Sequence, residues 1–192
     1  ISSVFYENFI NRAFSSKSAM MNILLIGNGA REHAIAEALK NSPQNPKIFS
    51  FMKSVNPGIK SLSGKIELGN YSELFKIKEF AEENKVDFAF IGPEEPLSNG
   101  VADALDDIDI PSVGPTKELA KLETSKSFTR NLIEKYKIKA SPKFKIFNSI
   151  EGIINFMDEL GSFVIKPDGL TGGKGVWVQG DHFQAKEEAL TY

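Results

Sequence analysis

The chain has 192 residues, of which 41% are hydrophobic and 25% are charged, with 23 basic against 25 acidic side chains and a formal net charge of −2. These proportions are typical of a globular protein, exclude a collagen-like or generally disordered chain, and argue against a strongly basic nucleic-acid-binding surface. The chain has no cysteine and two histidines, which excludes disulfide scaffolds and thiol catalysis and disfavours a multi-histidine metal site.

Residues 1–20 differ in character from the rest of the chain, and we leave them out of the fold prediction. The segment begins with Ile1, contains five serines, and ends at Met20-Met21, where either methionine can be an initiator. We expect an unmatched leader that comes from upstream sequence. An organelle transit segment rich in serine is the alternative, although such a segment should begin with methionine.

From Met21 to Val113, short apolar runs alternate with helical patterns. This alternation predicts βαβ units, and therefore an α/β, Rossmann-like domain with a parallel sheet covered on both faces. On the helices, we expect Ala34, Ile35, Ala38 and Leu39 to share one side, and Leu74, Phe75, Ile77 and Phe80 to point inward. The expected strands are Asn22–Ile26, Lys47–Phe51, Lys65–Leu68, Asp87–Ile91 and Pro111–Val113, and the expected helices are Glu32–Lys40, Tyr71–Glu83 and Leu97–Leu105.

The longest apolar runs, Ile23–Ile26 and Phe88–Ile91, are far shorter than the roughly 20 residues that span a bilayer.

In parallel sheets, ligands bind at the carboxyl edge. We therefore expect the loops at Gly27–Arg31, Ser54–Gly58 and Gly92–Leu97, which all follow strands, to line one crevice.

After Pro115 the pattern changes. Residues Lys117–Lys135 form helix readily and predict two helices. The expected elements beyond them are a strand at Pro142–Phe147, a helix at Ile150–Leu160, strands at Phe163–Lys166 and Gly175–Gln179, and a helix from near Phe183. This second unit ends without completing a layer, so we expect one complete domain and part of another.

The first motif is Gly27-Asn28-Gly29-Ala30-Arg31-Glu32-His33, between the first strand and the first helix. Glycines let the backbone approach an anion, the helix start presents free N–H groups, and Arg31 can add a bidentate phosphate contact. An ordinary strand-to-helix turn remains the alternative. The motif does not fit a dinucleotide fingerprint, because Glu32 stands where the third glycine belongs and no acidic residue ends the second strand at Lys53.

The second motif is Gly92-Pro93-Glu94-Glu95-Pro96-Leu97. Two prolines stiffen the loop and present the carboxylates of Glu94 and Glu95, which can accept hydrogen bonds from ribose hydroxyls or an amine. Acidic residues and proline are also favoured in the first turn of any helix, and this alternative stays open.

The third motif runs from Lys166 to Val176 and contains four glycines within residues 169–175. Its many exposed N–H groups and flanking lysines are typical of a phosphate-binding loop. It is not a Walker A loop, because the spacing is one residue short and Gly175 replaces the magnesium-binding Ser or Thr. A β-hairpin with a glycine-rich turn is the alternative, although the connection is long for one.

Together these segments resemble the glycinamide ribonucleotide synthetase (phosphoribosylamine–glycine ligase) family of the ATP-grasp superfamily. The resemblance runs from Met21 to the end of the chain and rests on Ile26–Ala34, Ile91–Leu97, Gly114–Thr116 with Leu122–Phe128, and Val164–Gly175. The resemblance implies three parts of the chain. Residues 1–20 are a leader outside the family, residues 21–122 are an α/β phosphosugar-binding domain that precedes the ATP-grasp fold, and residues 123–192 are the start of an ATP-grasp domain.

The resemblance also implies the activity: ATP-dependent ligation of glycine to 5-phosphoribosylamine through a glycyl phosphate, in cytoplasmic purine synthesis. It implies a cofactor, Mg2+ or Mn2+, whose ligands we expect beyond Tyr192, so that the chain is inactive alone and has no certain catalytic residue. It implies no nucleic-acid or membrane partner. The implied substrate-binding residues are Gly27, Asn28, Gly29, Ala30, Arg31, Gly92, Pro93 and Glu94, and the implied ATP-binding residues are Lys126, Lys166, Gly169, Gly172, Gly173, Lys174 and Gly175.

Two other functions stay open at this point. The lysines and the glycine-rich loop fit another ATP-grasp carboxylate–amine ligase equally well, whereas the first two motifs argue against it. A non-catalytic module that holds a phosphorylated sugar needs the first domain alone. The sequence does not indicate the oligomeric state, the preferred metal or a fusion to other purine enzymes.

Overall fold

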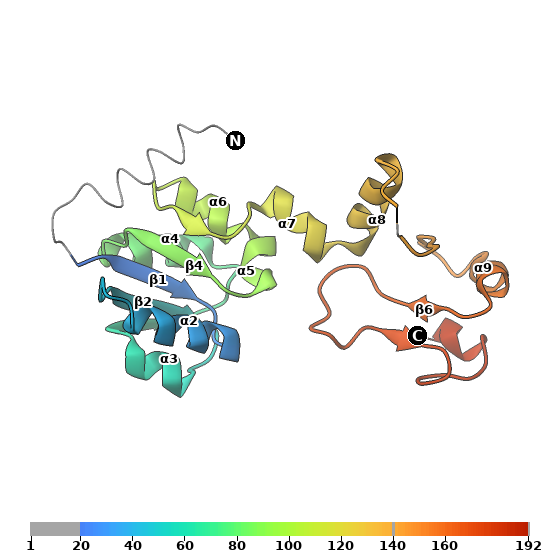
Figure 1. Cartoon of the computed structure of the whole chain (residues 1–192), viewed down its shortest axis with the longest axis horizontal. Coiled ribbons are helices and arrows are strands. Elements are labelled where there is room, and N and C mark those ends of the chain that lie inside the picture. The colour runs from blue at the N-terminus through green and yellow to red at the C-terminus, as the bar shows by residue number, and fades with distance from the viewer. Residues whose placement is uncertain (1–19, 140, 192) are drawn as a thin grey trace. The chain divides into compact units, whose positions relative to one another are not determined.

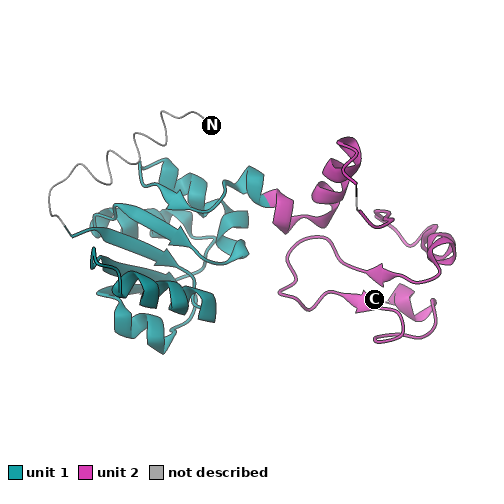
Figure 2. Ribbon diagram, in the orientation of Figure 1, with its two compact units in different colours: residues 1–120 teal, residues 121–192 magenta. Residues whose placement is uncertain are grey.

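The computed structural model of the chain describes residues 20–139 and 141–191. It divides into two compact units, residues 1–120 and 121–192, which are coloured separately in Figure 2. Apart from Met20, the leader predicted for residues 1–20 lies outside the described residues. Within the described ranges, no helix is both long and apolar enough to cross a membrane.

Unit 1 is built on a five-stranded sheet in which every pair of neighbours is parallel (Figure 1). The strand order is β3-β2-β1-β4-β5, and Leu24 in the middle of the sheet lies opposite Phe49 on one side and Ala89 on the other. The predicted α/β parallel-sheet fold is therefore confirmed. The chain order reverses at β1, so the switch point where such sheets bind ligands lies between β1 and β4. The strands are β1 (Asn22–Ile26), β2 (Lys47–Met52), β3 (Lys65–Leu68), β4 (Phe88–Ile91) and β5 (Ser112–Val113).

Five helices connect these strands: α2 (Ala30–Lys40), α3 (Pro57–Leu62), α4 (Leu74–Glu83), α5 (Glu94–Asn99) and α6 (Val101–Asp106). The helix α3 is not among the predicted elements, and it begins within the expected loop at Ser54–Gly58. The Asn56 side chain instead caps α3 by accepting hydrogen bonds from the Gly58 and Ile59 N–H groups (2.9 and 3.2 Å), and Pro57 fills the first helical position. The single helix predicted over Leu97–Leu105 is two helices, because Gly100 turns into the left-handed region with φ 88°.

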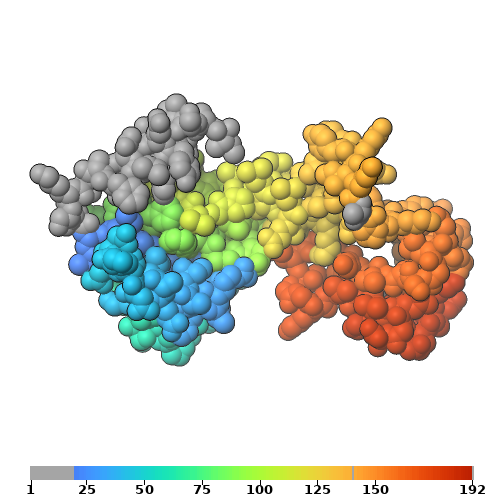
Figure 3. All heavy atoms as spheres, in the orientation of Figure 1, coloured from blue at the N-terminus to red at the C-terminus, as the bar shows by residue number. Residues whose placement is uncertain are grey.

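The sheet is covered on both faces, and successive residues of β1 alternate between them. Leu24 and Ile26 pack with Phe51 and with residues of α4 and α6 in one core cluster. Leu25 packs with Ile48 under α2 and α3, which lie side by side (Figures 1 and 3). Each fully buried Leu or Ile stabilises the fold by about 1.5–3 kcal/mol, whereas an exposed ion pair contributes about 0–1 kcal/mol, so these clusters dominate the stability of unit 1.

Two predicted helix faces are partly wrong. Phe75 is 77% exposed on α4, while Ile77 and Phe80 are buried as predicted. On α2, Ala34 and Ala38 are exposed, and Glu32 and Ala36 are buried instead. The inward face of α2 is therefore turned by part of a helical turn from the predicted one, which brings the Glu32 carboxylate against the sheet.

The boundary between the two units falls within α7 (Lys117–Thr124). Unit 2 continues with α8 (Lys126–Lys135), α9 (Ile153–Leu160), the antiparallel strands β6 (Val164–Ile165) and β7 (Trp177–Val178), and a 3-10 turn at Glu188–Thr191 in place of the predicted last helix. The two helices predicted within Lys117–Lys135 are confirmed. The small core of unit 2 contains Met157, Phe163, Phe183 and Ala189, with Trp177 packed against them.

The strand predicted at Pro142–Phe147 does not form, and residues 141–147 have no regular secondary structure. Proline lacks the N–H group that a strand ladder needs, and no strand of the described residues pairs with this segment. The apolar residues of this segment are therefore not enough to form a strand without a partner strand.

Candidate functional site

The turn between β1 and α2 is shaped by its glycines. Gly27 has φ 131°, in the region that favours glycine, and its N–H group donates to the carbonyl oxygen of Phe51 (3.1 Å). A Cβ atom added to Gly27 would lie 2.4 Å from Cγ of Glu32, and one added to Gly92 would lie 2.2 Å from Oε1 of Glu32. Both glycines therefore leave the space that the Glu32 side chain occupies between the ends of β1 and β4.

Glu32 is buried at this point, with 3% of its surface exposed. Its Oε2 accepts a hydrogen bond from the Gly29 N–H group (2.7 Å), and its Oε1 lies 3.7 Å from Nε of Arg31 and has no hydrogen-bond partner among the described residues. Glu32 was not among the predicted site residues, because from the sequence it only breaks the dinucleotide fingerprint. Its position three residues after the N-cap Gly29 was the available signal, because an N3 glutamate commonly closes onto the N-cap amide.

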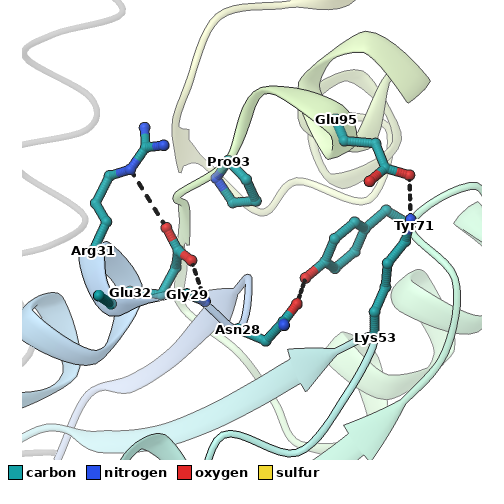
Figure 4. A pocket seen from close by; sticks show the side chains of 9 residues that line it. Asn28, Gly29, Arg31, Glu32, Lys53, Tyr71, Pro93 and Glu95 are labelled. Carbon is teal, nitrogen blue, oxygen red and sulfur yellow. Dashed lines mark hydrogen bonds and ion pairs between the residues drawn. The ribbon is translucent and has the colours of Figure 1, made fainter. Parts of the chain in front are cut away.

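A cavity of about 410 Å³ opens at the carboxyl ends of β1, β2 and β4 (Figure 4). It combines the start of α2 with three segments that come from elsewhere in the chain, at Lys53, at Tyr71 and at Pro93 to Glu95. The lining residues are Asn28, Gly29, Ala30, Arg31, Glu32, Lys53, Tyr71, Pro93 and Glu95. The expected crevice at the sheet edge is therefore present in unit 1, but only two of the three predicted loops line it, because no residue of Ser54–Gly58 is among the lining residues.

Lys53, Tyr71 and Glu95 form one wall of this cavity, as Figure 4 shows. The Lys53 ammonium pairs with Glu95 and lies over the Tyr71 ring, 5.3 Å from its centroid. The Tyr71 hydroxyl donates to Oδ1 of Asn28 (2.7 Å), and burial raises the pKa of Tyr71 to about 12. Sequence reasoning missed Lys53 and Tyr71 as site residues, although Lys53 directly follows a buried strand.

A second ion pair joins the two predicted loops. Both terminal nitrogens of Arg31 donate to Oε1 of Glu94 at 3.1 Å. The pKa of Glu94 is lowered first by the backbone N–H of its own residue and then by Arg31. Glu94 therefore pairs with Arg31, and the neighbouring Glu95 pairs with Lys53.

The remaining predicted residues divide into lining and supporting roles. Asn28, Gly29, Ala30, Arg31 and Pro93 line the cavity, whereas Gly27 and Gly92 lie behind it against Glu32. The Ser54–Gly58 loop supports the site: Nδ2 of Asn28 donates to the Ser54 hydroxyl (3.0 Å), and Nδ2 of Asn56 donates to the Asn28 carbonyl oxygen (3.1 Å).

The glycine-rich segment of unit 2 connects β6 to β7, so it is the loop of an antiparallel hairpin. The hairpin alternative thus describes its topology correctly. Gly169, Gly172 and Gly173 have φ of 84°, 58° and 78°, and a Cβ added to any of the three would meet no atom within 4 Å. The space beside these three glycines is therefore open. Lys166 and Lys174 are exposed at either side of it.

The base of this loop contacts the start of α8. The Lys126 ammonium donates to the Gly169 carbonyl oxygen (2.6 Å), and the Asp168 carboxylate accepts hydrogen bonds from the N–H groups of Lys126 (2.6 Å) and Ser127 (3.2 Å). The Ser127 hydroxyl also donates to Asp168 and, with these N–H groups, lowers the pKa of Asp168 to about 2. The sequence analysis gave Asp168 no role.

Metal ligands need several carboxylate or imidazole groups that converge on one point. Across residues 20–139 and 141–191 there is no group of three or more His, Asp or Glu side chains that could hold a metal ion. The residues described do not form a site that fits Mg2+ or Mn2+.

Comparison with known proteins identifies the family. The family model described as "Phosphoribosylglycinamide synthetase, N domain" matches residues 21–123, and "Phosphoribosylglycinamide synthetase, ATP-grasp (A) domain" matches residues 124–192. The chain belongs to the phosphoribosylglycinamide synthetase family. The suspected resemblance is thereby confirmed.

Two similar relatives are the proteins named phosphoribosylamine–glycine ligase of Methanocaldococcus jannaschii, 50% identical over 177 residues, and of Methanococcoides burtonii, 45% identical over 172 residues. Each alignment covers 90% of this chain and 40% of the relative. The chain thus spans about two fifths of the length of the curated relatives that it matches.

Solved structures support the fold. A phosphoribosylglycinamide synthetase from Anaerococcus prevotii matches with a TM-score of 0.58 at 16% identity, over 90% of this chain and 41% of that one. An N5-carboxyaminoimidazole ribonucleotide synthetase in complex with ADP matches with a TM-score of 0.71 at 19% identity, over 92% of this chain and 45% of that one. At these identities, the likeness concerns the fold alone.

Proposed function

We propose that the protein ligates glycine to 5-phosphoribosylamine with ATP, giving glycinamide ribonucleotide, ADP and phosphate, in purine synthesis. The observation that carries the proposal is the cavity at the switch point of unit 1. Asn28–Glu32 and, from the second motif, Pro93 and Glu95 line it. The chain is 45–50% identical to phosphoribosylamine–glycine ligases over 90% of its length. The partners in this proposal are small molecules, and we expect the reaction in the cytoplasm.

Residues 21–122 are the phosphosugar-binding domain in this proposal. The eleven-residue helix α2 begins at the cavity, and its first N–H groups carry the positive end of the helix dipole. We assign the sugar phosphate to Gly27–Arg31, and we assign the ribose to Gly92, Pro93 and Glu94. Arg31 and Lys53 can exchange their carboxylate partners for phosphate oxygens, because both anions accept the same charge-assisted hydrogen bonds.

Residues 123–192 begin the ATP-grasp domain. We assign the ATP phosphates to Lys126, Lys166 and the glycine-rich loop, in particular Gly169, Gly172, Gly173, Lys174 and Gly175. The open space beside Gly169, Gly172 and Gly173 supports this assignment, since a glycine-rich backbone and lysines can surround phosphate oxygens. A loop that closes over the phosphates would also exclude water.

The chemistry that we propose has two steps. An oxygen of the glycine carboxylate attacks the γ-phosphorus of ATP, ADP leaves, and glycyl phosphate forms. The amine of phosphoribosylamine then attacks the acyl carbon, phosphate leaves, and the amine loses a proton as the amide forms. Mg2+ or Mn2+ would neutralise phosphate charge in such a reaction, but the described residues form no metal site, so we assign no residue to the metal.

The test is ADP release by the protein in its full natural length, with phosphoribosylamine made in place from ribose 5-phosphate and ammonia. We expect release only when ATP, glycine and the sugar amine are all present. Release that needs glycine but accepts other amines would indicate another ATP-grasp ligase. Absence of release, with ribose 5-phosphate still bound, would indicate a sugar-phosphate-binding module and contradict the proposal.

A further inference from the structure

We propose that Asp168 is a positioning residue: it fixes the base of the glycine-rich loop to the N-terminus of α8 and thereby holds Lys126 beside that loop. The inference rests on the proposed function, which assigns the loop and Lys126 to the ATP phosphates. Asp168 itself is not expected to contact ATP. All residues concerned lie in unit 2.

The contacts of Asp168 are dense for an exposed side chain. Its carboxylate accepts hydrogen bonds from the N–H groups of Lys126 and Ser127 and from the hydroxyl groups of Ser127 and Ser125, the last at 3.2 Å. The Ser125 side chain meanwhile caps α8 by accepting from the Phe128 N–H group (3.2 Å). The first-turn N–H groups of α8 are thus satisfied partly by a carboxylate 42 positions further along the chain.

This arrangement is favourable for electrostatic reasons. The N-terminus of a helix carries partial positive charge, and a carboxylate that accepts several N–H groups there makes charge-assisted hydrogen bonds. The hydrogen bonds from the Ser127 hydroxyl and from the N–H groups of Ser127, Gly169 and Lys126 lower the pKa of Asp168 to about 2. The carboxylate therefore stays ionised and bound across the physiological pH range.

The other side of the contact is the loop itself. Asp168 also accepts from the Gly169 N–H group (2.9 Å), and the Gly169 carbonyl oxygen accepts from the Lys126 ammonium (2.6 Å). Beyond Gly169, Gly172 and Gly173 have open space around them. Among the described residues, the hydrogen bonds between the loop and α8 therefore come from the base of the loop, at Asp168 and Gly169.

The two contacts have different roles in the proposal. A phosphate group that takes the Lys126 ammonium would replace its contact to the Gly169 carbonyl, whereas the bonds from Asp168 to the backbone of α8 can persist. Asp168 would then keep the base of the loop and the Lys126 backbone together while the loop closes. Without Asp168, the loop would have to be ordered when ATP binds, which costs conformational entropy.

The experiment compares Asp168→Ala with Asp181→Ala in the full-length protein. Asp181 is an exposed aspartate of the same unit, and its N–H group donates to the Val178 carbonyl oxygen (3.2 Å) near β7. We expect Asp168→Ala to raise the KM for ATP about tenfold with a smaller change in kcat, since a misplaced group weakens a preorganised site, and Asp181→Ala to leave both unchanged. Asp168→Glu, which keeps the charge, should recover part of the loss.

A second readout does not depend on catalysis. Amide hydrogen exchange of residues 169–175 without ATP should be faster in Asp168→Ala than in the unchanged protein or in Asp181→Ala. If Asp168→Ala does not fold, Ser127→Ala provides the same test, because it removes one side-chain partner and should shift exchange and KM in the same direction by less.

Unchanged loop exchange and unchanged KM for ATP in a folded Asp168→Ala protein would overturn the inference. Failure of the proposed function would look different. In that case the unchanged protein would release no ADP, while the exchange comparison would still show whether Asp168 holds the loop.

Discussion

The Glu32 carboxylate accepts a hydrogen bond from the N–H group of Gly29, at 2.7 Å. This contact closes the Gly-Asn-Gly turn onto the first turn of α2. The same carboxylate fills the space left by Gly92 at the end of β4. One buried side chain thus joins the two loops to which we assign the sugar phosphate and the ribose.

Glu32→Gln should lower the stability of the protein by about 1–3 kcal/mol, because an amide nitrogen would replace one buried carboxylate oxygen and lack an acceptor. Thermal unfolding measures the change. The matched control is Glu37→Gln on the same helix, where the glutamate side chain is 60% exposed and lies 3.6 Å from His33. Equal midpoints for the two variants would show that the Glu32 carboxylate does not hold the turn.

Gly92→Ala should destabilise the protein by about 1–3 kcal/mol through overpacking, since the new Cβ would lie 2.2 Å from Oε1 of Glu32. Adding Glu32→Ala removes the opposing atoms. The double variant should therefore lose less stability than the sum of the two single variants. Additive losses in denaturant unfolding would contradict the packing that we describe.

Lys53→Met should weaken ribose 5-phosphate binding roughly tenfold or more, because a charged hydrogen bond contributes about 1.5–3 kcal/mol. Methionine keeps most of the side-chain length, so packing against the Tyr71 ring is largely retained. Isothermal titration of ribose 5-phosphate measures the effect, and Lys60→Met, an exposed position on α3, is the control. Equal affinities for the two variants would remove Lys53 from the phosphate site.

Tyr71 should ionise only at strongly alkaline pH, since burial raises its pKa from 10.0 to about 12. A folded-state pKa above the unfolded value means that the contribution of Tyr71 to stability is complete below pH 10 and is lost as the pH rises towards 12. An ultraviolet absorbance titration of the unchanged protein, minus that of Tyr71→Phe, isolates this group. A difference curve with an ordinary tyrosine midpoint would contradict the burial of its hydroxyl.

The sheet of unit 1 could be predicted because its strands are short apolar runs bounded by glycine, proline and asparagine. The same rule failed at Asn56-Pro57-Gly58, where an asparagine cap and an N1 proline begin α3. Glycine, proline and asparagine mark the end of one element in the sequence, but they do not show whether a loop or a new helix follows.

The two glycine-containing loops at the sheet edge could also be predicted, since both follow strands of one parallel sheet. Lys53 and Tyr71 could not, because only the packing of β2 and the segment before α4 brings them beside Asn28. Asp168 was missed for a similar reason: its partners at the start of α8 are more than 40 positions away in the sequence.

The most direct test of the proposed ligase uses glycine labelled with oxygen-18 in both carboxylate oxygens, together with ATP, phosphoribosylamine and the full-length protein. If glycyl phosphate forms, one labelled oxygen leaves with each phosphate and the other stays in the amide of the product. Mass spectrometry should therefore find phosphate with one heavy oxygen, in an amount equal to the ADP. Unlabelled phosphate accumulating with ADP would contradict the proposed reaction.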